Sequence, residues 1–176
     1  MKDFRFSLQA SFSPKIGDLV NMLEYTRQTT LNAVEQLTIE QLDFRHEPDG
    51  NSIGTLLSHI AAVEWAYSLP TFESRKPTSA EKERWGPALR LGPGALQVYR
   101  GFDLSVYAAL LEEVRKNTLT QLSKHDDLWL GEEWILSDGS LVDNHWALFH
   151  VFEDELSHRG QILLICNHLL PRKFSV

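Results

Sequence analysis

Cysteine is nearly absent from this 176-residue chain, in which Cys166 is the single example. An internal disulfide cannot form, so the disulfide-stapled folds of small secreted proteins are excluded and a reducing compartment is favoured. The sequence also lacks any run of about 18 consecutive apolar residues, the length that a membrane-spanning helix requires. Charges interrupt the apolar residues near the N-terminus. We therefore expect no signal peptide and no membrane partner, and predict a cytoplasmic protein.

Basic side chains are scarce as well. Seventeen Lys and Arg stand against 24 Asp and Glu, which gives a formal net charge of -7. Non-specific affinity for nucleic acid comes from clustered Lys and Arg, so the acidic excess argues against a nucleic-acid partner. The chain is 43% hydrophobic and 23% charged, which is close to the globular average and excludes a disordered or fibrous protein. Its length predicts a single domain over residues 1–176.

Four segments carry apolar residues at spacings of three and four, the pattern of amphipathic helices with one buried face. The predicted helices run from Pro14 to Leu37, from Asn51 or Ser52 to a point before Pro70, from Asp103 to about Lys124, and from Asp143 or Asn144 to about Leu169. A capping box at Thr38-Ile39-Glu40-Gln41 predicts one extra helical turn after the first of them.

The connections differ in character. Residues 71–102 contain six Pro and Gly residues from Pro77 to Gly94, which predicts a long crossover with at most one short turn of helix. The segment from Trp129 to Leu136, followed by a Ser137-Asp138-Gly139 turn, predicts short extended pieces. The predicted fold class is therefore all-α: a four-helix bundle with a long crossover between helices two and three and short extended pieces before helix four.

A polar stripe distinguishes the fourth predicted helix. His150, Asp154 and His158 follow one another at steps of four, and Gln161 comes three residues later. Residues at these spacings stand above one another, with Cβ atoms about 5–6 Å apart. Apolar neighbours place the stripe beside the buried side of the helix, where a carboxylate needs a cation or strong hydrogen-bond donors to offset its burial.

The second predicted helix supplies a further imidazole, His59, three residues after Leu56 on the inward face. His59 from one helix with Asp154 and His158 from a facing helix would form a divalent-metal site with open positions. Position alone leaves other interpretations open. His59 can be a hydrogen-bonded core histidine, Asp154 and His158 can be an ordinary ion pair, and His150 can be structural.

The remaining candidates carry weaker signals. We expect surface positions for the other four histidines, which are His46, His125, His145 and His168. Cys166 has no activating base nearby in the sequence, so we expect it to pack as a small hydrophobic residue rather than act as a nucleophile.

Two motifs carry a resemblance to a known family. Leu37-Thr38-Ile39-Glu40-Gln41-Leu42 with the segment from Asn51 to Ala61 resembles the first signature of the DinB-like (YfiT-like) metalloprotein superfamily. The second signature is similar to Asn144-His145-Trp146 and the segment from His150 to Ile162, with His-Arg-Gly-Gln at 158–161 as its most specific part. The resemblance covers nearly the whole chain.

Membership implies a four-helix bundle with a long crossover, a divalent metal ion (zinc or nickel), a small-molecule substrate and usually a homodimer. The ligand positions fall on His59, Asp154 and His158. Many members have histidine where this chain has Asp154; thiol-dependent isomerases similar to this fold have a carboxylate there. One carboxylate among two imidazoles shifts the preference toward harder ions, so nickel, manganese and iron become more acceptable.

The resemblance also implies an activity. Characterised relatives are transferases or isomerases that use a low-molecular-weight thiol such as mycothiol or bacillithiol, and we expect such an S-transferase or isomerase here. A metal-dependent hydrolase is the second hypothesis, and a non-catalytic metal-binding or stress-response scaffold is the third. His150 and Gln161 are candidates to support the ligands or line the pocket. Glu64 and Trp65, just after His59, are weaker pocket candidates, and we expect both to pack in the bundle. No residue is assigned as a general base.

Overall fold

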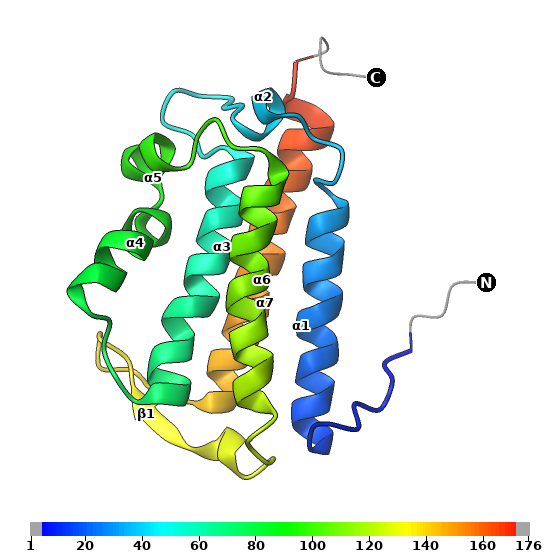
Figure 1. The fold of residues 1–176 in the computed structure, drawn as a ribbon, viewed down its shortest axis with the longest axis vertical. Helices are drawn as coiled ribbons and strands as arrows, with labels where there is room; N and C mark the ends of the chain where they lie inside the picture. Colours follow the sequence, from blue (N-terminus) through cyan, green and yellow to red (C-terminus); the bar gives the residue numbers. More distant parts are fainter. Residues whose placement is uncertain (1–4, 172–176) are drawn as a thin grey trace.

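The computed structural model describes residues 5–171, and four long helices lie side by side along one axis (Figure 1). The helices and strands, in chain order, are α1 (Pro14–Asn32), α2 (Ile39–Leu42), α3 (Ile53–Ser68), α4 (Ser79–Arg90), α5 (Gly92–Val98), α6 (Leu104–Leu122), β1 (Glu133–Ile135), β2 (Leu141–Asp143) and α7 (Asn144–Leu164). Short π-helical turns extend α3 over Leu69–Glu73 and α7 over Ile165–Leu169. The predicted four-helix bundle is confirmed.

Side-chain caps set the starts of three long helices. Ser52 accepts a hydrogen bond from the Thr55 amide, Asp103 from the Ser105 amide and Asp143 from the Trp146 amide. These donors have no partner within a helix, so a capping oxygen stabilises each start. The capping box of Thr38 and Gln41 is present as predicted and opens α2.

The end of the first helix differs from the predicted one. Helix α1 ends at Asn32 rather than Leu37, and a tighter turn follows in which the Val34 amide donates to the Leu31 carbonyl. Val34 stays fully buried, which explains why its apolar spacing looked helical. Helix α3 ends at Ser68, before Pro70 as predicted, and the π-helical turn over Leu69–Glu73 continues directly from it.

Helix α3 lies at the centre of the bundle, in contact with α4, α6 and α7, and α1 packs against α7. Gly54 permits the close approach of α3 to α6, because a Cβ at this position would lie 2.5 Å from the Tyr107 hydroxyl oxygen. Tyr107 is itself fully buried. The core divides into two hydrophobic clusters: one surrounds the N-terminal half of α3, and the other lies near the β hairpin.

The crossover between α3 and α6 contains more helix than predicted. Its 12-residue helix α4 and seven-residue helix α5 contradict the expectation of at most one short turn. A capping box between Thr78 and Glu81 starts α4, and Trp85 and Ala88 bury against the core. Gly92 and Pro93 fall at the start of α5, where a positive φ and a missing N–H are tolerated. The long crossover itself is confirmed.

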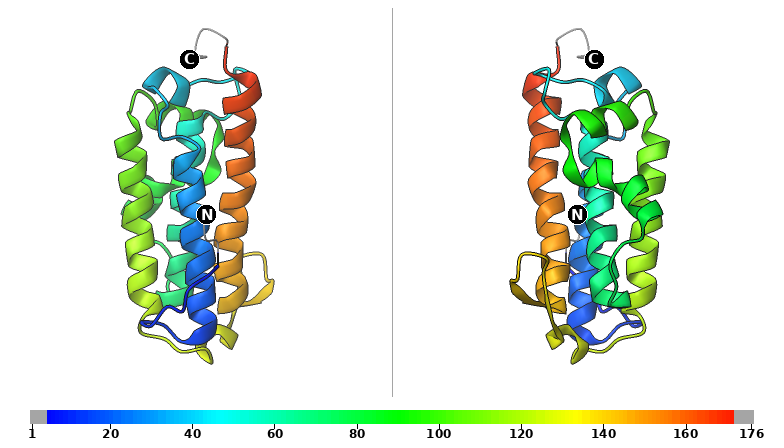
Figure 2. Two further views of the ribbon diagram at one scale, coloured as in Figure 1. Left: turned by 90° about the vertical axis from the view of Figure 1, so that its right-hand side faces the viewer. Right: turned by 90° about the vertical axis from the view of Figure 1, so that its left-hand side faces the viewer.

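The predicted extended pieces before the last helix are confirmed in part: β1 and β2 form a two-stranded antiparallel hairpin, in which Trp134 is opposite Val142. Trp129–Gly131, also predicted to be extended, forms a short 3₁₀ turn instead. The hairpin projects beside the N-terminal end of α7 (Figure 2). The Trp134 indole N–H donates to the Asn144 side chain, and the Asn144 amide donates to the Glu132 carbonyl. These bonds tie the hairpin to the first turn of α7.

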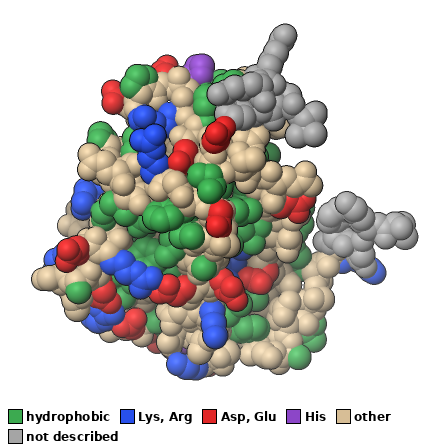
Figure 3. Space-filling view, turned by 45° about the horizontal axis from the view of Figure 1, so that its top comes forward, with side chains coloured by type: hydrophobic (Ala, Val, Ile, Leu, Met, Phe, Trp, Pro, Cys, Tyr) green, Lys and Arg blue, Asp and Glu red, His purple; other side chains and the backbone are tan. Residues whose placement is uncertain are grey.

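None of the helices in the described part of the chain combines the length and apolar character that a bilayer crossing requires. On the face shown in Figure 3, Lys and Arg side chains are scattered among Asp and Glu side chains. This interspersed pattern is that of an ordinary solvated surface.

Candidate metal centre

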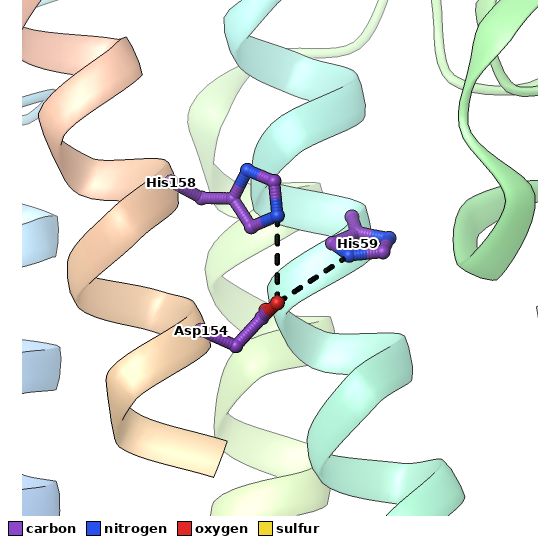
Figure 4. Close-up of side chains that lie close together, drawn as sticks. All are labelled: His59, Asp154 and His158. Atoms are coloured by element: carbon purple, nitrogen blue, oxygen red, sulfur yellow. Dashed lines mark ion pairs between the residues drawn. The ribbon is translucent and has the colours of Figure 1, made fainter. Parts of the chain in front are cut away.

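Three of the predicted site residues converge between two packed helices. His59 lies in the middle of α3, while Asp154 and His158 occupy successive turns of α7, and all three side chains point into the space between the helices (Figure 4). Asp154 and His158 project the same way because they are four residues apart. The packing of α3 on α7 brings His59 to them across nearly a hundred residues of sequence.

The geometry of this group is compact. Asp154 Oδ1 lies 3.9 Å from His59 Nε2 and 3.5 Å from His158 Nε2. One ligand atom from each residue lies within 4.8 Å of the other two. The imidazole rings meet edge to face, with centroids 4.7 Å apart and an interplanar angle of 77°. Each side chain keeps 12 to 17% of its surface exposed, so the group lies just below the surface.

Helix α4 of the crossover orients His59. The Nδ1 atom of His59 lies 2.9 Å from the Ala88 carbonyl oxygen. A carbonyl oxygen only accepts, so Nδ1 carries the proton and, in the neutral ring, Nε2 presents its lone pair toward Asp154. A ligating histidine is ordinarily fixed this way, with its second ring nitrogen bonded to a carbonyl or carboxylate. Ala88 lies in the last turn of α4, and its carbonyl also accepts a hydrogen bond from the amide of Leu91, which caps the helix.

Two buried polar atoms of the group have no hydrogen-bond partner: Asp154 Oδ2 and His158 Nδ1. Buried polar atoms are almost always paired, so an orphaned carboxylate oxygen in a cluster of ligand atoms fits a missing cation. Two imidazoles and one carboxylate form the donor set of open, catalytic metal sites, which leave positions for water or substrate. The residues present therefore fit a divalent ion.

Electrostatics favour a cation at this point. Burial disfavours the charged form of Asp154, but the facing His158 and His59 imidazoles hold its pKa well below the usual range. Burial also opposes protonation of His59, yet the facing Asp154 carboxylate and the hydrogen bond to the Ala88 carbonyl raise its pKa above 6.5. The carboxylate is thus ionised at neutral pH, and it favours the protonated form of His59.

The two supporting candidates lie outside the three-residue group. His150 is one turn before Asp154 on α7; its Nδ1 lies 3.0 Å from a Glu153 carboxylate oxygen, and its ring stacks on Trp146. Tyr67 of α3 meets the same imidazole edge to face at 5.0 Å. Gln161 is exposed, three residues after His158. Among the described residues, the cluster of His, Cys, Asp and Glu side chains that could hold a metal ion consists of His59, Asp154 and His158, without His150.

A buried network of four charged residues, which the sequence patterns did not predict, lies next to this group. Arg27 of α1, Glu64 of α3, Arg115 of α6 and Glu155 of α7 meet inside the bundle, with side-chain exposures of at most 8%. A signal was available, because Arg27 follows Leu23 by four and Arg115 follows Leu111 by four, on apolar faces. Glu64 is buried as the packing interpretation expected, but it packs through ion pairs.

The other residues considered from the sequence occupy less suggestive places. His46, His145 and His168 are exposed as expected. His125 is half-buried and stacks on Trp129 at 4.2 Å, which corrects its assignment to the surface. Trp65 stacks on Trp85 of α4, and both line a cleft of about 400 Å³ on the α4–α6 side of α3. Burial raises the pKa of Cys166, which packs against the core as predicted.

Known proteins identify the family of this chain and share its fold. The family model described as mycothiol-S-transferase matches residues 18–168, a stretch that includes all three converging residues. Among solved structures, YfiT from Bacillus subtilis, described as "a probable metal-dependent hydrolase with an unusual four-helix bundle topology", is similar with a TM-score of 0.60. It is 17% identical, with 92% of this chain and 91% of that chain covered, so the likeness shows the fold alone. None of the curated proteins matches the sequence.

Proposed function

The chain belongs to the mycothiol-S-transferase family, a metal-dependent group with the DinB-like fold, and from this premise we propose that His59, Asp154 and His158 hold its divalent ion. The observation that carries the proposal is the convergence of three ligand atoms within 4.8 Å from two helices. Family membership supplies the reaction class, and the site supplies the residues.

Each residue has a distinct part in the proposed centre. His59 offers Nε2 because the Ala88 carbonyl holds the proton on Nδ1. Asp154 offers an ionised oxygen and lowers the net charge of the centre by one. His158 offers Nε2 from the next turn of the same helix. A divalent ion held there would act as a Lewis acid, and coordination to it would favour loss of the proton from a substrate thiol.

The proposed ion is zinc or nickel. Imidazole suits both metals, and a single carboxylate is compatible with either. Three protein ligands leave room for a substrate atom, as in other catalytic sites. Elemental analysis of protein purified without added metal identifies the bound ion directly.

The proposed thiol is mycothiol, and the acceptor is a small molecule with an electrophilic carbon. In such a transfer the thiol proton goes to a base or to solvent and the sulfur forms a bond to the electrophilic carbon. The carbon in turn releases a leaving group with its bonding electron pair, or passes a π-electron pair to a neighbouring atom, which takes up a proton. His150 is the nearest further imidazole along α7. We propose that it lies, with Tyr67 and Trp146, on the hairpin side of the position where the substrate binds beside the metal centre. A role for Gln161 in orienting the thiol stays a prediction.

We also propose that the protein is a single domain, a homodimer and cytoplasmic. The match over residues 18–168 supports a single domain over residues 1–176. Exposed Phe149, Leu156 and Leu163, spaced seven apart on α7, support a homodimer through that helix. A free thiol substrate persists in a reducing compartment, which supports a cytoplasmic location.

Metal analysis of point variants tests the proposed centre. The wild-type protein is expected to hold about one divalent ion per chain, and His158→Ala and Asp154→Ala are expected to lose it. His145→Ala is the matched control, because His145 is an exposed histidine of the same helix outside the group. Retention of wild-type metal content by both ligand variants would dispose of the proposed centre.

A thiol series tests the reaction. Metal-loaded protein is incubated with mycothiol, bacillithiol or glutathione and a panel of small electrophiles, and consumption of the thiol is followed. Turnover that requires mycothiol supports the S-transferase. Metal-dependent turnover without any thiol would instead support a hydrolase, and tight metal binding with no turnover would support the scaffold.

A further inference from the structure

We propose that the buried arginine–glutamate network of Arg27, Glu64, Arg115 and Glu155 positions the metal centre by locking α3 and α7 in register and at a set distance. The inference rests on the proposed function, because the metal centre is the site that is positioned. The four side chains touch no reacting atom, so they are positioning residues.

The network has a symmetric design. Arg115 grips Glu64 with two bonds, Nε to Oε1 at 2.8 Å and Nη2 to Oε2 at 3.1 Å. Arg27 grips Glu155 in the same way, Nε to Oε1 at 3.0 Å and Nη2 to Oε2 at 3.1 Å. Two-pronged arginine–carboxylate pairs fix geometry more tightly than single bonds.

Cross-links join the two pairs into one unit. Arg27 Nη2 also donates to Glu64 at 2.9 Å, and Arg115 Nη2 lies 3.6 Å from a Glu155 oxygen. The arginines bind each other's helix as well: Arg27 donates to the Leu111 carbonyl of α6, and Arg115 donates to the Leu23 carbonyl of α1, both at 2.7 Å. All four long helices therefore meet at one level.

The glutamates lie on the two helices that carry the proposed ligands. Glu155 directly follows Asp154 on α7, and Glu64 comes five residues after His59 on α3. Both ligand-bearing helices are thus held by the same two guanidinium groups, supplied by the two helices that carry no ligand. Movement of α7 along α3 would change the His59–Asp154 distance and the Glu64–Glu155 bridge together.

Magnitudes show why this linkage controls metal binding. A slip of one residue moves a helix by about 1.5 Å and turns it by about 100°. Bonds of 2.8 to 3.1 Å cannot survive that displacement. A metal site tolerates only about 0.2 Å in its ligand distances. A register in which the three ligands no longer meet would therefore also break the hydrogen bonds of the network, so the network disfavours it.

Stability alone does not account for these residues. The network lies between the two hydrophobic clusters of the core, where apolar side chains would fill the same space. Replacing a buried ion network by apolar residues of similar volume is often neutral or stabilising, whereas ion pairs specify a unique arrangement in some proteins. The two positive and two negative charges of these four buried residues cancel, and Arg115 also pairs at 2.9 Å with the half-exposed Glu24 at the edge of the network.

The test replaces one gripping pair without changing net charge: Arg27→Met with Glu155→Leu, which leaves Arg115 paired to Glu64. The control is Arg84→Met with Glu113→Leu, an Arg–Glu pair of 2.7 Å that is exposed and joins α4 to α6. Zn²⁺ affinity is measured by competition with a chelator, the Co²⁺ absorption spectrum reports ligand geometry, and imidazole ¹⁵N shifts of His59 and His158 are recorded without metal.

We expect the Arg27–Glu155 variant to stay folded and to bind Zn²⁺ at least about tenfold more weakly, with a changed Co²⁺ spectrum and shifted imidazole signals. The control should match wild type in all three. A folded variant with wild-type affinity, spectrum and shifts overturns the inference. If the pair variant does not fold, the fully apolar Arg27→Met, Glu64→Leu, Arg115→Met, Glu155→Leu protein replaces it, with the same expected and overturning results.

The metal-free readout separates two kinds of failure. Wild-type protein that binds no divalent ion refutes the proposed metal centre. The imidazole shifts then still decide the positioning role, because they report the contacts of His59 and His158 with Asp154 in the absence of metal. Unchanged shifts in the pair variant refute that role independently.

Discussion

Replacing Asp154 by Asn removes the single negative charge of the proposed centre and leaves side-chain volume almost unchanged. Asp154 Oδ1 lies 3.9 and 3.5 Å from the two imidazole nitrogens, and Oδ2 is buried without a partner. The carboxylate therefore has little to hold except a cation and the two histidines. We expect Asp154→Asn to keep its fold and to lose most of its metal affinity.

The size of the loss follows from the ligand count. Zinc binding to four-ligand structural sites is worth about 10–16 kcal/mol at pH 7, or about 2.5–4 kcal/mol for each ligand. A factor of ten corresponds to about 1.4 kcal/mol, so loss of one ligand weakens affinity by about 10²–10³-fold. The Asn carbonyl oxygen remains a weak neutral ligand, which places Asp154→Asn near the lower figure.

Chelator competition with Zn²⁺ and with Ni²⁺ at pH 7.5 measures this change. Glu153→Gln is the control, because Glu153 is the preceding acidic residue on α7, is half exposed and pairs with His150 instead. It loses the same charge from the same turn, so it measures the general electrostatic effect. Affinity of Asp154→Asn within about threefold of the Glu153→Gln value would refute Asp154 as a ligand.

Three further predictions follow from the same contacts. The pKa of His59 lies above 6.5 in the metal-free protein, so below that pKa a binding metal ion must displace a proton. Metal affinity should then fall about tenfold per pH unit for each displaced proton. Metal titrations at several pH values check this, and Asp154→Asn should shift the onset of the fall to lower pH. Two arginines hold the pKa of Glu64 at about 2 although burial opposes its ionisation. Its ionised form therefore contributes fully to the free energy of unfolding above pH 4.5, and this contribution should fall by about 3 kcal/mol toward pH 2. Urea unfolding should show a much smaller fall when all four network residues are apolar. Gly54→Ala should cost about 1–3 kcal/mol by collision with Tyr107, while Gly160→Ala, with open space around it, should be neutral or stabilising in thermal melts.

Local patterns were enough to locate much of the site. The steps of four from His150 to His158 place Asp154 and His158 on one face of any helix, whatever the rest of the chain does. The capping residues Ser52, Asp103 and Asp143 mark helix starts through bonds to amides two or three residues away. Such signals depend on neighbours in sequence, which explains why the predicted starts and the four-helix class are confirmed.

The crossover shows where local patterns mislead. Six Pro and Gly residues predicted little helix there, although most of these breakers lie at helix ends or outside the helices, and the capping box of Thr78 and Glu81 was not recognised in the sequence. Pro87 lies inside α4, in its last turns. Burial of Trp85 and Ala88 against the core stabilises this helix, and that contribution cannot be read from composition.

The sequence by itself determined the helical spacing, the face on which Asp154 and His158 stand, and the inward position of His59. Only the tertiary structure decided which partners those side chains meet. The Ala88 carbonyl that holds the His59 proton is a backbone atom, so no side-chain pattern announces it. The arginine–glutamate network joins residues 27, 64, 115 and 155, each of which looks like a stray charge on an apolar face until the four helices pack. A buried charge is stable only with its partners, and those partners are set by three-dimensional packing.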